Sequence, residues 1–67
     1  MIRLKVREIA EKQGLNMAQL ARRADLDNNT VRKIWHDPTK EISTITLDKI
    51  ARALGVNASE LIETLPD

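Results

Sequence analysis

Residues 15–36 read LNMAQLARRADLDNNTVRKIWH, and this stretch decides the fold. Residues 15–20 (LNMAQL) place an N-cap residue after an apolar N′ residue and before a polar N3 and an apolar N4 residue, the pattern of a capping box with a hydrophobic staple. Residues 26–31 (LDNNTV) repeat this pattern 11 residues further on. Two helix starts so close together leave room only for a tight turn through Asp25-Leu26, so the stretch predicts a helix-turn-helix.

Four helix starts of this kind occur along the chain. The pattern returns at residues 42–47 (ISTITL) and 56–61 (VNASEL), and Gly14 and Gly55 stand where a left-handed residue would end a helix. Residues 2–4 can form an extended segment that pairs with a neighbouring strand, and the sequence leaves this alternative open. With an opening helix, the sequence predicts an all-α fold of five short helices, over residues 5–13, 17–24, 28–36, 44–54 and 58–65.

Size and composition exclude most other classes of protein. A chain of 67 residues forms one small domain, which we expect to span residues 1–67. It has no cysteine and one histidine, so it cannot build a disulfide framework, a thiolate zinc site or a zinc finger. No phosphate-cradling loop and no pair of nucleophile and base is present, so we expect no enzyme, no catalytic residues, no cofactor and no metal.

The distribution of charge gives a weak indication of an anionic partner. The net charge is +1, but residues 1–40 hold nine Lys/Arg against five Asp/Glu, whereas residues 41–67 hold two against five. No apolar run exceeds two residues, so we expect no membrane span and a cytoplasmic protein.

The predicted helix over residues 28–36 has two distinct faces. At 100° per residue, Val31, Ile34 and Trp35 fall on one face, and we expect them in the core. Amide and basic side chains without any acid form the opposite face, and such groups suit the major groove of DNA because Asn binds adenine and Arg or Lys donates to guanine. A polar outer face is also typical of an ordinary solvated helix, and the tight turn before it favours DNA binding. The residues of this outer face are Asn28, Asn29, Arg32, Lys33 and His36.

The chain resembles the helix-turn-helix family of lambda-repressor-like and Cro-like regulators, the xenobiotic-response-element (XRE) type. The matching residues are Leu20, Ala21, Leu26, Asp27, Thr30, Val31 and Ile34, and residues 47–56 (LDKIARALGV) resemble the fourth helix of the family with its glycine stop. Two positions depart from the family pattern. Asp25 replaces a turn glycine, which Asp tolerates because it adopts left-handed conformations more easily than most residues. Met17 replaces a phosphate-binding glutamine, so that contact does not carry over.

The resemblance implies a sequence-specific transcriptional regulator, with repression as the favoured role, that binds double-stranded DNA as a homodimer on a pseudo-palindromic site. The implied base-reading residues are Asn28, Asn29, Arg32 and Lys33. Contacts to the DNA backbone position a protein without specifying sequence. We expect such contacts from Asn16, at a helix N-terminus that favours anions, and from Arg22, Arg23, Thr30 and Lys40. Arg22 and Arg23 also fit an ordinary solvated surface.

A second hypothesis is a protein-interaction module, such as an antitoxin-like partner, in which the helix-turn-helix is secondary. Ile45 falls on the outer side of its predicted helix. Leu61, Ile62 and Leu65 give the last predicted helix more apolar residues than one narrow stripe requires. These four residues predict a surface for a partner, either another polypeptide or a second copy of the chain.

Overall fold

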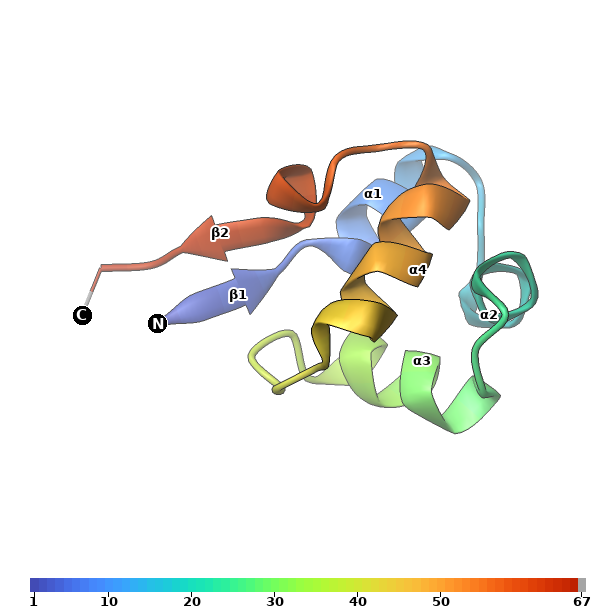
Figure 1. The fold of residues 1–67 in the computed structure, drawn as a ribbon, viewed down its shortest axis with the longest axis horizontal. Helices are drawn as coiled ribbons and strands as arrows, with labels where there is room; N and C mark the ends of the chain where they lie inside the picture. Colours follow the sequence, from blue (N-terminus) through green and yellow to red (C-terminus); the bar gives the residue numbers. More distant parts are fainter. Residues whose placement is uncertain (67) are drawn as a thin grey trace.

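The computed structural model describes residues 1–66, which form four α-helices and a small two-stranded sheet (Figure 1). In chain order the elements are β1 (Ile2–Leu4), α1 (Val6–Lys12), α2 (Met17–Ala24), α3 (Asn28–His36), α4 (Thr44–Leu54), the 3-10 helix η1 (Ala58–Leu61) and β2 (Ile62–Thr64). The helices pack together, and the sheet projects from one end of the bundle. No helix in this part of the chain is long and apolar enough to cross a membrane.

The starts of the helices follow the capping signals of the sequence. The side-chain oxygen of Asn16 accepts a hydrogen bond from the backbone N–H of Gln19 at 2.9 Å, and the Gln19 side chain accepts from the Asn16 N–H at 2.9 Å, so the predicted capping box of α2 is formed. Ser43 Oγ accepts from the N–H of Thr46 at 3.1 Å and caps α4. Asp27 is the N-cap residue of α3, although its side chain forms no capping hydrogen bond.

The predicted helix ends are also largely confirmed. Gly14 and Gly55 have φ angles of 73° and 69°, in the left-handed region that the sequence predicts for them. The bounds of α2, α3 and α4 agree with the predicted ranges of 17–24, 28–36 and 44–54, and α1 is one residue shorter at each end than the predicted range of 5–13.

The C-terminal segment corrects two predictions. Residues 58–65 do not form a fifth α-helix, and the fold is not all-α, because the single 3-10 turn η1 leads directly into β2. The alternative of an extended segment at residues 2–4 is confirmed. β2 pairs antiparallel with β1 in the register Ile2↔Thr64, Arg3↔Glu63 and Leu4↔Ile62.

A long-range partner explains why the predicted helix fails. The start signal at Asn57 is genuine: its N–H donates to the Glu60 carboxylate at 2.9 Å, and a turn follows. Beyond that turn the β-branched residues Ile62 and Thr64 favour a strand. Pairing with β1 satisfies the backbone polar groups that a helix would otherwise satisfy locally. Since β1 lies at the other end of the chain, the local pattern contains no sign of it.

Arg3 of β1 forms ion pairs that connect the sheet to α1. Its Nη1 lies 2.8 Å from Glu8 Oε2 on α1 and 3.4 Å from Glu63 Oε1 on β2. The hydrogen bond and negative charge of Glu8, with a smaller effect of Glu63, raise the pKa of Arg3 above its ordinary value. The N–H of Leu4 donates to the Pro38 carbonyl oxygen at 2.6 Å, so β1 also holds the loop that follows α3.

One apolar cluster forms the core, and among the described residues no polar side chain is buried. Leu20 of α2, Ile50 of α4 and Leu61 of η1 have no exposed surface. Leu61 therefore belongs to the core, and its predicted place on a partner surface is wrong. Trp35 is only 8% exposed, which confirms the prediction that it packs inward. α2 contacts both α3 and α4, so the core fixes the orientation of the helix-turn-helix.

Candidate nucleic-acid interface

A left-handed residue sets the turn between α2 and α3. Asp25 ends α2 with φ 55° and ψ 48°, which confirms that this Asp takes the conformation usually given to glycine. The N–H of Leu26 donates to the Ala21 carbonyl oxygen at 2.9 Å and closes the turn. The chain re-enters a helix at Asn28, so α2 and α3 form the predicted helix-turn-helix.

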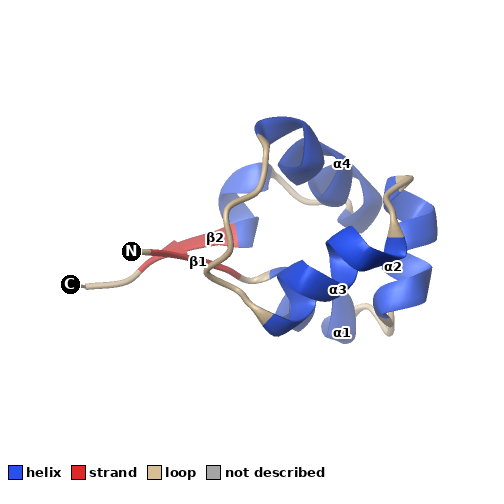
Figure 2. Ribbon diagram, turned by 90° about the horizontal axis from the view of Figure 1, so that it is seen from below, coloured by secondary structure: helices blue, strands red, loops and turns tan. Residues whose placement is uncertain are grey.

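α3 lies on the near side of the molecule in Figure 2, and the polar residues of its outer face are exposed. Val31, Ile34 and Trp35 are 1%, 2% and 8% exposed, and they attach the helix to the core. The outer residues Asn28, Asn29, Arg32, Lys33 and His36 are all exposed. α3 contains no acidic residue, so nothing on the helix neutralises Arg32 and Lys33. This face can therefore donate hydrogen bonds to an anionic or acceptor-rich surface.

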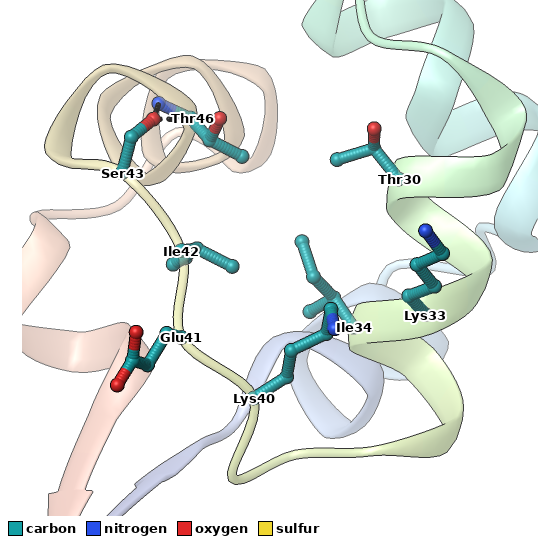
Figure 3. A pocket seen from close by; sticks show the side chains of 8 residues that line it. All are labelled: Thr30, Lys33, Ile34, Lys40, Glu41, Ile42, Ser43 and Thr46. Atoms are coloured by element: carbon teal, nitrogen blue, oxygen red, sulfur yellow. Dashed lines mark hydrogen bonds between the residues drawn. The ribbon is translucent and has the colours of Figure 1, made fainter.

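A pocket of about 240 Å³ separates α3 from the start of α4. Lys33 stands on α3, and Lys40 extends from the loop toward the same helix (Figure 3). The carboxylate of Glu41 points away from both lysines. The fold thus brings together two positive charges that lie seven positions apart in the sequence. The other residues that line the pocket are Thr30, Ile34, Ile42, Ser43 and Thr46.

The family of the chain follows from this architecture and from one comparison. The family model of the Cro/C1-type helix-turn-helix DNA-binding domain matches residues 5–67, nearly the whole chain. The chain belongs to the Cro/C1-type helix-turn-helix family. It is therefore a DNA-binding regulator, and the predicted resemblance is confirmed. No curated protein matches the chain.

In the Cro/C1-type fold, two of the other residues predicted to contact the DNA backbone lie on α2. Arg22 is exposed and lines a surface hollow with Asp25, Asp27 and Asn28, so it lies beside the start of α3. Arg23 is also exposed, but it lines neither this hollow nor the pocket at Lys33.

The capping box limits how Asn16 can bind a phosphate. Its backbone N–H and its side-chain oxygen both form hydrogen bonds with Gln19. Its side-chain amide donors have no partner in the described part of the structure. Any phosphate contact by Asn16 therefore uses this amide rather than the backbone N–H.

Two hydroxyl residues that the sequence marks only as helix-capping signals also lie beside the lysines. Ser43 and Thr46 line the pocket beside the lysines, and Ser43 Oγ donates to Thr46 Oγ1 at 3.0 Å. Their cap motif marks where α4 begins, but only the fold shows that this start faces α3. Within residues 1–66, no group of three or more His, Cys, Asp or Glu side chains is placed to hold a metal ion.

Proposed function

We propose that this chain is a sequence-specific regulator of transcription that binds double-stranded DNA with α3 in the major groove and represses by occupying its site. The observation that supports this proposal is the exposed, acid-free face of α3 behind the tight turn of a helix-turn-helix. A helix presented in this way can enter the major groove, where base edges offer distinct patterns of donors and acceptors.

Different residues of the proposed interface contact the bases and the backbone of DNA. Asn28, Asn29, Arg32 and Lys33 are the proposed base-reading residues, because their side chains project from the outer face of α3. Backbone contacts come from the residues around that face, which set the register of the protein on the duplex. These residues are Asn16, Arg22, Arg23, Thr30 and Lys40.

A homodimer on a pseudo-palindromic site extends the proposal. Ile2 and Ile62 are 53% and 37% exposed, and the strand register places them on one face of the sheet. The molecule is 34 Å long, with the sheet at one end of this axis (Figure 1). If two copies meet end to end at their sheets, the distance between their centres equals the length of one molecule. This distance is close to the roughly 34–36 Å between the half-sites that helix-turn-helix dimers read.

Selection from a pool of randomised duplexes tests this function. The purified chain is incubated with the pool at about physiological salt, and bound duplexes are recovered over several rounds and sequenced, with Lys33→Ala run in parallel. We expect a palindromic site that the variant fails to enrich. If the wild-type chain enriches nothing, the proposal of sequence-specific binding is wrong.

A protein partner is the second candidate function, and one residue favours it. Ile45 is 69% exposed in the first turn of α4. An isoleucine this exposed is suited to contact another polypeptide. The chain would then act as an antitoxin-like partner or adaptor. Stoichiometric co-purification of a protein that Ile45→Ser releases would support this function.

A further inference from the structure

Two of the proposed base-reading side chains on α3 are bonded to each other. Arg32 Nη2 donates a hydrogen bond to Asn29 Oδ1 at 2.6 Å. The two residues lie three positions apart, so they are neighbours on the helix surface, and both are exposed. A hydrogen bond from a cationic donor is shorter and stronger than a neutral one. Among the described residues, this is the one polar partner of the Arg32 side chain.

The bond changes what Asn29 presents to a DNA base. A free Asn side chain offers one donor and one acceptor edge, which matches the N7 acceptor and N6 donor of adenine. Here the Asn29 oxygen accepts from Arg32, which occupies one of its two lone pairs, whereas the amide N–H groups have no partner among the described residues. Arg32 has only donors. The pair therefore presents mostly donors, with one lone pair of the Asn29 oxygen remaining as an acceptor.

A surface made up mostly of donors discriminates among bases. Guanine offers two acceptors in the major groove, N7 and O6, whereas adenine and cytosine each place an amino donor there. An arginine that keeps four of its five N–H groups can bind both guanine acceptors at once. The bond to Asn29 also restricts the guanidinium before DNA arrives, which reduces the side-chain entropy that binding would otherwise remove.

We infer that Arg32 and Asn29 act as one unit that reads guanine, and that Asn29 is a positioning residue for Arg32 rather than an independent reader of adenine. The inference rests on the proposed function, since it specifies the base that α3 selects.

The test measures base preference at each position of the selected site. Duplexes with every single base substitution are titrated against the wild-type chain, Arg32→Ala, Asn29→Ala, Asn29→Asp and the double variant. We expect Arg32→Ala to lower the preference for one guanine about ten-fold. Asn29→Ala should lower the preference for the same guanine, and the double variant should lose no more there than Arg32→Ala alone.

Asn29→Asp separates positioning from direct reading. The carboxylate of this variant still accepts a hydrogen bond from Arg32, but it lacks the amide donors. The guanine preference should therefore survive. The affinity for all duplexes should fall, because the new negative charge is repelled by the DNA phosphates. If Asn29 reads adenine by itself, Asn29→Ala relaxes a different, adenine-containing position and Asn29→Asp loses that adenine. This result would overturn the inference while leaving the proposed function intact.

Asp48→Ala is the matched control. Asp48 is exposed on α4, outside the proposed base-reading and backbone-contacting residues, and its carboxylate binds Arg52 at 3.0 Å, so its loss removes an arginine partner elsewhere and should leave the guanine preference unchanged. A loss of guanine preference in this variant as large as that in Asn29→Ala would contradict the inference. Failure of the wild-type chain to select any site would overturn the proposed function, and the inference with it.

Discussion

Gln13 Nε2 donates a hydrogen bond to the carbonyl oxygen of Leu54 at 2.7 Å, although the two residues lie 41 positions apart. Gln13 is the C-cap residue of α1, and Leu54 is the last residue of α4. The final carbonyls of a helix have no partner within the helix. The Gln13 side chain supplies one for α4, so it ties the ends of two helices together.

Loss of this bond should weaken the fold. We expect Gln13→Ala to lower the free energy of unfolding by about 1 kcal/mol, because the Leu54 carbonyl loses its side-chain donor. In a domain of this size the melting temperature should fall by roughly 4–8 °C. Thermal melting followed by circular dichroism measures the change. Lys12→Gln, an exposed change one residue away, should alter stability by no more than about 0.5 kcal/mol. Equal melting temperatures for the two variants would show that the bond contributes nothing.

The left-handed turn residue Asp25 permits a conformational test. We expect Asp25→Val to lower the free energy of unfolding by about 1–2 kcal/mol, because a β-branched residue is strained at a φ of 55°. Asp25→Asn removes the charge but tolerates the same conformation, and it should remain close to wild type. Urea denaturation measures all three proteins. A loss in Asp25→Asn as large as that in Asp25→Val would mean that charge rather than backbone geometry matters at this turn.

Leu61 and Ile62 are neighbours with opposite surroundings. Leu61 is completely buried in η1, whereas Ile62 is 37% exposed at the start of β2. Leu61→Ala should lower the free energy of unfolding by about 2–5 kcal/mol, because it leaves a cavity in the core. Ile62→Ala should lower the free energy of unfolding by clearly less. Denaturant titrations of both variants provide the comparison, and equal losses would contradict this arrangement of the C-terminal segment.

Lys33 and Lys40 should affect DNA binding in different ways. We expect Lys33→Ala to reduce the preference for the selected site over random duplex, since its proposed partner is a base. Lys40→Ala should weaken binding to both duplexes equally and reduce the slope of log K against log salt by about 1, the value for one phosphate contact. Fluorescence anisotropy across a range of salt concentrations measures both quantities.

Lys12→Ala is the matched control for this pair of variants. It removes one positive charge from α1, outside the helix-turn-helix, so it should leave both the preference and the salt slope nearly unchanged. The base-reading assignment of Lys33 fails if Lys33→Ala and Lys40→Ala weaken specific and random binding to the same extent.

Trp35 should report folding rather than DNA contact. It is the single tryptophan and is 8% exposed on the inner side of α3. We expect its emission to shift to longer wavelength on unfolding and to stay at the same wavelength when a saturating duplex is added. Protection from iodide quenching should likewise be the same with and without DNA. Strong quenching of Trp35 by DNA alone would place the indole at the interface and contradict its assignment to the core.

Local signals in the sequence determined most of the helical framework. Capping motifs at Asn16 and Ser43 and the glycines at positions 14 and 55 act within a few residues, so they could be read without the fold. The spacing of Val31, Ile34 and Trp35 identified the inner face of α3 for the same reason. The residues of the outer face, and therefore the candidate base readers, followed directly.

Tertiary structure decided what depends on contacts between distant parts of the chain. The strand at Ile62–Thr64 exists because β1, almost sixty residues earlier, supplies its backbone partners. The pocket that joins Lys33 to Ser43 depends on how the loop after α3 returns to the bundle, and the Pro38 contact with β1 holds that loop. The free energy of such contacts comes from burial and from long-range hydrogen bonds, which a local pattern of residues does not encode.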